Sequence, residues 1–213
     1  MQKIFLVSFV IIFFSSLFST ASKTFNIDEN QLKNIENKFG SQGRKIVEEW
    51  DSMLETSKNE NILNKIKNVN DFFNQIPYKT DVVHWKKQDY WATPFEFMGT
   101  GGGDCEDYAI AKYFSLIKLG IPDEKLRITY VSYQKTNTAY EEAHMVLTYY
   151  HKVGMEPIVL DNIDKTLQVA SKRTDLKPVY SFNTSGLWQA QTKGEARVGD
   201  NNLKSWKDLM ERF

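Results

Sequence analysis

Thr100–Tyr113, which reads TGGGDCEDYAIAKY, is the stretch that decides the fold, and it contains the only cysteine of the chain, Cys105. Its three consecutive glycines form a permissive loop, and the residues after them are good helix formers until Gly120 interrupts the run. The pattern predicts that Cys105 lies in the first turn of a helix. Unpaired amides and the helix dipole favour an anion there, so the position suits a cysteine nucleophile.

Three carboxylates, Asp104, Glu106 and Asp107, surround this cysteine. Negative charge raises the pKa of a thiol, so something should offset it. Capping and the helix dipole explain part of the pattern, with Asp104 as the N-cap. A divalent cation explains all of it, and calcium, which takes about six to eight oxygen ligands and is abundant outside the cytoplasm, fits best. The residues alone leave both explanations open.

Upstream of this stretch, apolar residues recur at helical spacing between residues 26 and 76. The pattern predicts three helices, with breaks at Gly40–Gly43 and Ser57–Glu60. From Pro77 to the glycine run we expect an irregular segment rich in aromatic residues.

Downstream of the cysteine helix the periodicity becomes that of strands. Alternation or short apolar runs predict strands near residues 126–131, 144–150, 157–161 and 178–183, and a short helix closes the chain at residues 203–213. Helices followed by an antiparallel sheet predict an α+β fold.

A cysteine nucleophile needs a base, and the base needs a third group that holds its ring. Of the three histidines, His151 lies in a polar turn and His84 in the irregular segment, whereas His144 begins a strand. If residues 144–150 and 157–161 form a hairpin centred between residues 152 and 153, Asp161 lies directly opposite His144, within hydrogen-bonding reach. The alternative is a half-buried strand histidine and a carboxylate at a strand end.

Acyl transfer also needs hydrogen-bond donors for the oxyanion. The backbone amide of Cys105 is the natural first donor. The indole N–H of Trp91 is a candidate second donor, although Trp91 serves equally well as a wall of the cleft.

Composition bounds the remaining possibilities. The 213 residues are 41% hydrophobic, which suffices for one substantial core, and the 27 basic residues equal the 27 acidic ones. The chain therefore has no excess of positive charge that would favour nucleic acid as a partner. A signal peptide at residues 1–21, and hence export, is predicted by Lys3, the apolar run from Ile4 to Phe18 and the small residues that follow. A retained N-terminal anchor is the alternative, although about 15 apolar residues are short for a bilayer span of roughly 20. The expected organisation continues with an N-terminal helical part at residues 22–76, which shares one domain with a catalytic core at residues 77–213.

Several motifs together resemble the bacterial transglutaminase-like cysteine proteases. They occur in the family's order between about residue 70 and residue 190, and comprise WATPFE at residues 91–96, GGGDCEDYAIAK at 101–112, HMVL at 144–147, VLDN at 159–162 and PVYSFN at 178–183.

The resemblance implies a papain-like/transglutaminase-like α+β fold with a triad of Cys105, His144 and Asp161. It also implies a calcium site at Asp104, Glu106 and Asp107. Family members cleave the N-terminal region of large surface adhesins at a di-alanine site, which releases cells from biofilms. An inner-membrane receptor for cyclic di-GMP holds them inactive. Adhesin and receptor are therefore the expected partners.

Two alternatives to an endopeptidase remain at this level. The same triad serves a transglutaminase or amidase, in which an amine resolves the thioester in place of water. A non-catalytic calcium-binding interaction module would retain the fold without the reaction.

Overall fold

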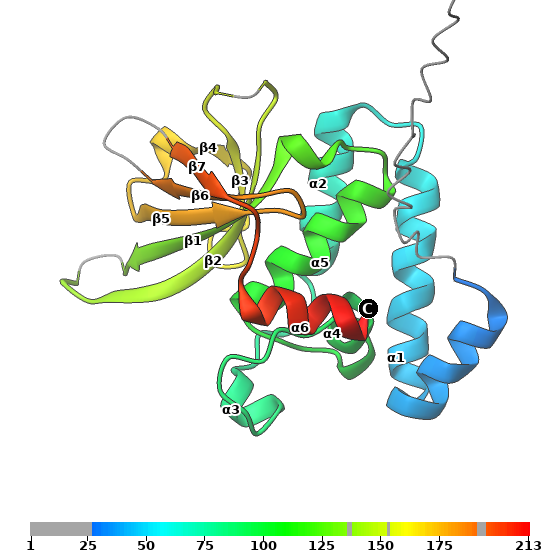
Figure 1. The fold of residues 1–213 in the computed structure, drawn as a ribbon. Helices are drawn as coiled ribbons and strands as arrows, with labels where there is room; N and C mark the ends of the chain where they lie inside the picture. The colour runs from blue at the N-terminus through cyan, green and yellow to red at the C-terminus, as the bar shows by residue number, and fades with distance from the viewer. Residues whose placement is uncertain (1–26, 136–137, 153, 191–194) are drawn as a thin grey trace, which may run out of the picture.

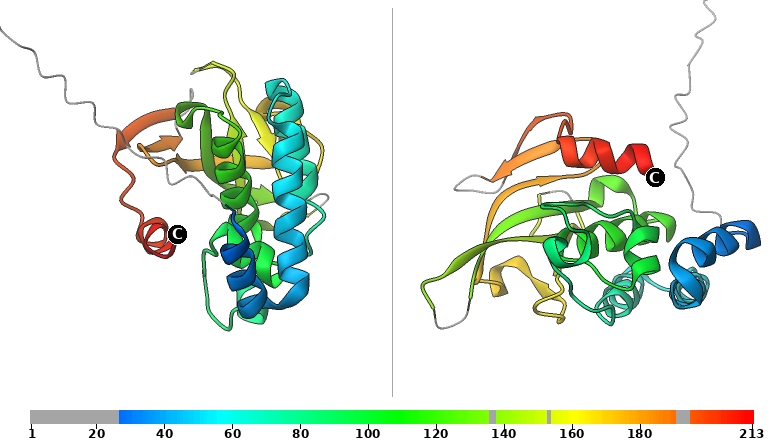
Figure 2. Two further views of the ribbon diagram at one scale, coloured as in Figure 1. Left: turned by 90° about the vertical axis from the view of Figure 1, so that its right-hand side faces the viewer. Right: turned by 90° about the horizontal axis from the view of Figure 1, so that it is seen from below.

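Helix α5 (Cys105–Lys118) lies between an antiparallel sheet and the two long N-terminal helices in the computed structural model of the protein (Figure 1). The structure describes residues 27–135, 138–152, 154–190 and 195–213, so the predicted signal peptide at residues 1–21 lies outside it. The right-hand view of Figure 2 also shows the strands on one side and the long helices on the other. The prediction that Cys105 begins a helix is confirmed.

Helices α1 (Glu29–Ser57) and α2 (Ile62–Phe73) occupy the region in which three helices were expected. At Gly40 the backbone is non-helical, with φ 81° and ψ 174°, so the first expected break is a kink within α1. The second expected break separates α1 from α2.

The expectation of an irregular segment before the glycine run was wrong at two places. Helix α3 (Asp81–His84) and helix α4 (Pro94–Thr100) lie within it. Glu96 N donates to Thr93 Oγ1 at 3.2 Å and Thr93 N donates to Glu96 Oε2 at 2.9 Å, which is a capping box with proline at the first helical position. That signal was present in the sequence as Thr-Pro-x-Glu.

The described residues form a seven-stranded antiparallel sheet in the order β4-β3-β2-β1-β5-β6-β7. Its strands are β1 (Leu126–Gln134), β2 (Glu141–Tyr149), β3 (Ile158–Leu160), β4 (Gln168–Val169), β5 (Leu176–Phe182), β6 (Leu187–Ala190) and β7 (Glu195–Gly199). The α+β class is confirmed. Strands β4, β6 and β7 were not anticipated, because they are short and half-buried or exposed, and so lack a clear alternation of apolar residues.

The hairpin register between β2 and β3 differs from the expected one. Leu147 pairs with Leu160, and the same register places Val146, not His144, across from Asp161. The turn is centred one residue later than expected, next to Gly154, whose φ of 83° suits only glycine well. Moving the centre of a hairpin by one residue moves the pairing by two, so His144 and Asp161 still share a face as diagonal neighbours.

One continuous hydrophobic core joins the N-terminal helices to α5 and the sheet. Trp50 of α1 is fully buried, and its Nε1 donates to Ser115 Oγ of α5 at 2.8 Å. Phe73 of α2 stacks on Phe97 of α4, with ring centroids 6.0 Å apart. The helices therefore support α5 from the side opposite to the sheet.

Helix α6 (Lys204–Arg212) closes the chain across α5, close to the expected closing helix. Trp206 stacks on Phe114, with ring planes 4° apart. Arg212 Nη1 contacts Glu96 Oε2 at 2.7 Å, and Arg212 Nη2 donates to Trp91 O at 2.6 Å. Helix α6 therefore holds in place the segment that precedes the glycine run, through contacts to Trp91 and Glu96. Within the described part of the chain, none of the helices has the length and apolar character needed to cross a membrane.

Replacing Gly43 with alanine should destabilise the protein, although alanine favours a helix over glycine by about 1 kcal/mol. An added Cβ would lie 2.4 Å from Gly99 O of α4, where backbone cannot easily move. Overpacking of this kind costs roughly 1–3 kcal/mol, so the packing effect should exceed the propensity effect. Urea unfolding measures the change, with Ser41→Ala in the same helix as control. A Gly43→Ala variant more stable than the parent would contradict the close packing of α1 on α4.

Candidate active site

A cavity of about 680 Å³ lies between α3, the start of α5 and strands β1, β2 and β5. Cys105 and His144 both line it, together with Tyr78, Asp81, Val82, Trp91, Asp104, Glu106, Tyr130, Met145 and Tyr180. The first turn of α5 supplies the cysteine, and the neighbouring strand β2 supplies the histidine. The fold therefore brings the predicted nucleophile and the predicted base to one hollow.

His144 and Asp161 form a buried hydrogen-bonded pair behind this cavity. The distance between His144 Nε2 and Asp161 Oδ1 is 2.8 Å, and the two residues are 4% and 1% exposed. A carboxylate on Nε2 fixes the orientation of the ring and leaves Nδ1 as the nitrogen that can exchange a proton with a thiol.

The other two histidines lie elsewhere. His84 Nε2 lies 2.8 Å from Thr100 Oγ1, and His151 is exposed in the turn after β2. Neither lines the cavity that contains Cys105.

Asp161 is held as a carboxylate. Burial by itself would raise its pKa, but the hydrogen bond and charge of His144, the amide of Ile163 and the guanidinium of Arg173 outweigh burial and lower the pKa below its usual value. Asp161 therefore stays ionised and can stabilise a protonated His144.

Cys105 has the opposite electrostatic environment. Its Sγ donates to Glu106 Oε2 at 3.2 Å, and burial, followed by the charges of Glu106 and Asp104, raises the pKa of the thiol well above its ordinary value. The amide of Met145 acts in the other direction, but less strongly. The helix N-terminus alone does not make this cysteine a thiolate, so the charge conflict expected from the sequence is present in the structure.

Asp81, Asp104 and Asp107 gather beside the cysteine. Each offers a carboxylate oxygen, and these oxygens lie within 4.8 Å of one another. Asp104 Oδ2 accepts from the amide of Asp81 at 3.3 Å, and Asp107 Oδ2 accepts from the amide of Asp104 at 3.3 Å. The cluster therefore joins the start of α3 to the start of α5.

This grouping raises the pKa of each carboxyl. Burial is the largest cause for each of them, and charges of neighbouring carboxylates add to it. The pKa of Asp104 rises to about 8 and that of Asp81 to about 6. The pKa of Glu106 rises to about 7, mainly through burial. A cation between the carboxylates would reverse this effect.

The donor set fits a calcium ion. Asp81 Oδ1 and Asp104 Oδ1 are buried and have no hydrogen-bond partner among the described residues. Carboxylate oxygens are the ligands that calcium prefers. Of the three ligands expected from the sequence, the cluster contains Asp104 and Asp107 but not Glu106, which contacts the thiol. Metal ligation by Glu106 stays a prediction.

Sequence reasoning missed Asp81. It lies 23 residues before Asp104, in a segment expected to be irregular, and it reaches the cluster only because the chain folds back. Lys79 N donates to Gly103 O at 2.8 Å, and Ala92 N donates to Asp107 Oδ1 at 2.7 Å. These long-range contacts have no local sequence signal.

Trp91 forms a wall of the cavity. Its indole Nε1 donates to Asp89 Oδ1 at 2.9 Å, and its ring stacks on Phe182 with centroids 5.5 Å apart. In this arrangement the indole N–H is engaged with Asp89 and is not directed at an oxyanion. Cys105, as the first residue of α5, keeps an amide without an intrahelical partner.

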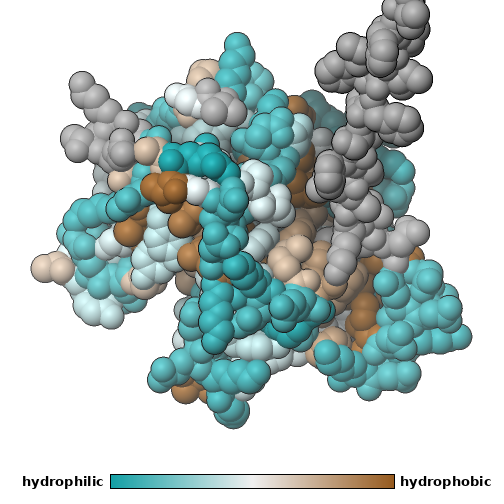
Figure 3. All heavy atoms as spheres, in the orientation of Figure 1, coloured by the Kyte–Doolittle hydropathy of each residue, from teal (hydrophilic) through white to brown (hydrophobic). Residues whose placement is uncertain are grey.

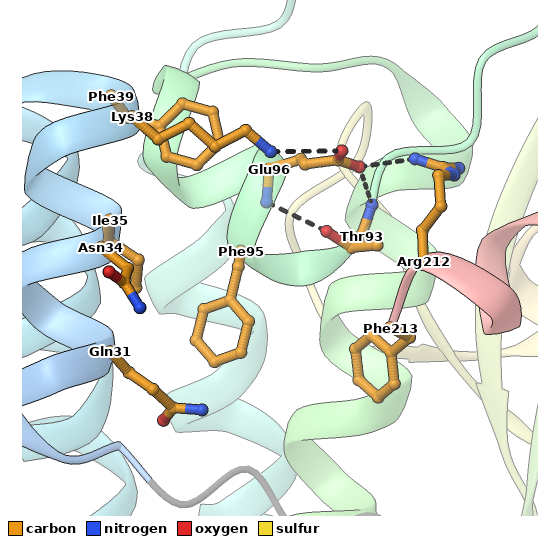
Figure 4. A pocket seen from close by; sticks show the side chains of 10 residues that line it. All are labelled: Gln31, Asn34, Ile35, Lys38, Phe39, Thr93, Phe95, Glu96, Arg212 and Phe213. Atoms are coloured by element: carbon orange, nitrogen blue, oxygen red, sulfur yellow. Dashed lines mark hydrogen bonds and ion pairs between the residues drawn. The ribbon is translucent and has the colours of Figure 1, made fainter.

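A second hollow, of about 440 Å³, lies between α1, α4 and the end of α6 (Figure 4). Glu96 sits at its edge, where it pairs with Arg212 and Lys38. In Figure 3 hydrophobic atoms appear on this side of the molecule, between α1 and the end of α6, on an otherwise mostly hydrophilic face. The second hollow contains none of Cys105, His144 and Asp161.

Comparisons with known proteins found one matching family model and several similar solved structures. The family model of the bacterial transglutaminase-like cysteine proteinases matches residues 41–195. A solved structure of Legionella pneumophila LapG, EGTA-treated, shares 40% identity, covers 87% of this chain and 97% of that chain, and superposes with a TM-score of 0.75. Calcium-bound Legionella pneumophila LapG shares 40% identity over 87% of this chain and 99% of that chain, with a TM-score of 0.74. A search of curated proteins found no match.

The stability of the protein in a calcium chelator should fall as the pH rises from about 4 to about 8. Asp104 has a pKa of about 8 in the folded protein against an ordinary value of 3.8. The folded state therefore holds more protons than the unfolded state in this window, and rising pH favours unfolding. Urea midpoints with calcium and with chelator should diverge as the pH increases.

Asp104→Asn is the control for this pH series, because it removes the carboxyl whose pKa rises to about 8. It should flatten the profile in chelator. A chelator profile that rises with pH over this window in the parent protein would show that the cluster does not titrate as described.

Proposed function

Because the chain belongs to the family of bacterial transglutaminase-like cysteine proteinases and is a cysteine peptidase, we propose that Cys105, His144 and Asp161 are its catalytic triad. The observation that carries the proposal is the 2.8 Å contact between His144 Nε2 and Asp161 Oδ1, at the wall of the cavity that Cys105 also lines. Nucleophile, base and orienting group thus come from α5, β2 and the end of β3.

The proposed reaction proceeds through a thioester. His144 Nδ1 takes the thiol proton as Cys105 Sγ attacks the scissile carbonyl carbon, and the Cys105 amide donates to the oxyanion. The imidazolium then returns the proton to the amine as the C–N bond breaks. Water, deprotonated by His144, attacks the thioester, releases a carboxylate and restores the thiol. Throughout, Asp161 stabilises the charged form of His144.

We propose further that Asp81, Asp104 and Asp107 bind calcium. The acidic cluster and the similarity to calcium-bound LapG support this. A bound calcium ion supplies positive charge that offsets the carboxylates beside the thiol. The residues themselves hold the start of α3 against the start of α5, so that the walls of the cavity stay in place.

For substrate, partner and location we propose what the family resemblance implies. The substrate is the N-terminal region of a large surface adhesin, whose cleavage releases biofilm cells. The regulator is an inner-membrane receptor for cyclic di-GMP, and the enzyme works in the periplasm after removal of residues 1–21. Cell fractionation with and without residues 1–21 tests the location, and co-purification with the receptor tests the regulator.

Replacing Cys105 with alanine should abolish cleavage of an adhesin N-terminal fragment, because the chain has no other thiol. The circular-dichroism spectrum should be unchanged, since Cys105 lies at the edge of a cavity. The matched control substrate carries a changed di-alanine site and should resist cleavage by the parent enzyme. The same reaction with a fluorescent primary amine separates hydrolysis from transamidation: cross-linked amine without chain cleavage would contradict the endopeptidase.

Replacing Asp81 with asparagine should weaken calcium binding by about tenfold or more, equal to a loss of at least about 1.4 kcal/mol. The change removes one charged ligand from the cluster of three. Calorimetric titration in the Cys105→Ala background measures the affinity without self-cleavage. Asp89→Asn is the control, because Asp89 lines the same cavity but lies outside the cluster. Equal affinities for Asp81→Asn and the parent would place the ion elsewhere.

A further inference from the structure

The carboxylate of Asp161 is shared between the histidine and a buried arginine. Asp161 Oδ1 accepts from His144 Nε2 at 2.8 Å and from Ile163 N at 3.0 Å, and Asp161 Oδ2 accepts from Arg173 Nη2 at 2.7 Å. Arg173 is only 3% exposed. Three donors from three different segments therefore fix the plane of the carboxylate.

Arg173 is itself held in place by a second carboxylate. Arg173 Nε donates to Asp175 Oδ1 at 3.0 Å and Arg173 Nη2 to Asp175 Oδ2 at 2.8 Å, which is a two-point contact with a planar guanidinium. Asp175 O in turn accepts from the amide of Gln134 at the end of β1, at 2.8 Å. The position of the guanidinium is thus set by the sheet.

The charges in this group explain why Arg173 needs Asp175. One arginine on Asp161 would neutralise the carboxylate that must stabilise a protonated His144. With Asp175 included, Asp161, Arg173 and Asp175 carry one net negative charge. Among the described residues, Lys112 of α5 also approaches Asp161, but its Nζ contacts the backbone carbonyl at 3.1 Å and not the carboxylate. Negative charge therefore remains available on the side of His144.

We infer that Arg173 is a positioning residue for the peptidase reaction: it holds the Asp161 carboxylate so that Oδ1 faces Nε2 of His144, and Asp175 holds Arg173. The inference rests on the triad role proposed above. Without Arg173, one oxygen of Asp161 loses its buried donor, and the carboxylate is free to rotate away from the imidazole. Partners of this kind typically change activity by about 10–100-fold when removed, as they do around metal-bound histidines.

The competing explanation is a buried ion pair that only stabilises the fold. The chain contains a matched case for comparison. Arg127 of β1 pairs with Glu195 of β7, is 7% exposed, and packs over Trp188 with its guanidinium 4.0 Å from the ring centroid. This pair belongs to the same sheet, but neither residue lines the cavity that contains Cys105. Arg127→Met therefore reports the cost of losing a buried arginine without a change at the triad.

The experiment compares Arg173→Met, Arg173→Lys and Arg127→Met in calcium-containing buffer. The first readout is the downfield proton NMR signal of the His144 imidazole N–H, which needs no substrate and should disappear in Asp161→Asn. Arg173→Met should shift or broaden this signal and lower kcat on the adhesin fragment by about 10–100-fold, with KM within about twofold of the parent. Arg173→Lys should restore part of the imidazole signal and part of kcat. Arg127→Met should lower the urea midpoint and leave the imidazole signal and kcat unchanged.

A double-mutant cycle separates positioning from a purely structural role. If Arg173 acts through Asp161, Arg173→Met should lower kcat little further in the Asp161→Asn background. An equal loss in both backgrounds, or an unchanged imidazole signal in Arg173→Met and Arg173→Lys, would overturn the inference. Should Arg173→Met fail to fold, Arg173→Lys decides through the same signal. If the parent enzyme shows the signal but cleaves no adhesin fragment, the proposed substrate fails while the imidazole readout still decides the role of Arg173.

Discussion

The packing of negative charge against the nucleophile is the constraint on which the rest of the site depends. Asp81, Glu106 and Asp107 are buried and Asp104 is half-buried, and all four lie around the first turn of α5. Their burial raises the pKa of each carboxyl, and the charges nearest the sulfur raise the pKa of the thiol as well. A helix dipole of about half a charge cannot offset so many carboxylates, and the proposed calcium ion would supply the missing positive charge.

The same carboxylates organise the wall of the cavity. Oxygens of Asp81, Asp104 and Asp107 accept backbone amides of Tyr90, Asp81 and Ala92, which belong to the segment around α3. Val82 and Val83 of α3 are exposed, whereas Trp85 and Tyr90, which follow α3, pack against the edge of the core. The position of the segment therefore depends on these hydrogen bonds as well as on packing, so calcium at the proposed site would also hold this side of the cavity in place.

Asp161, on the other side of His144, has the opposite electrostatic environment, which lowers the pKa of a carboxyl group. Asp161 is as buried as the cluster, yet donors from His144, Ile163 and Arg173 lower its pKa. The carboxylates beside Cys105 therefore tend towards protonation, whereas Asp161 tends towards ionisation. The difference comes from the neighbours of each carboxylate: Asp161 receives hydrogen bonds and faces His144 and Arg173, whereas the clustered carboxylates face one another.

The sequence by itself determined the features that depend on local spacing. Helical periodicity and the glycine run placed Cys105 at a helix start, and alternation of apolar residues predicted the central strands. The hairpin register differs from the expected one by two residues, an even number, so His144 and Asp161 still lie on the same face of the sheet. Only the tertiary structure decided which distant groups complete the site. Asp81 and Arg173 reach Asp104 and Asp161 through folded loops, because charges that share a buried space must find partners from anywhere in the chain, and no local pattern records that requirement.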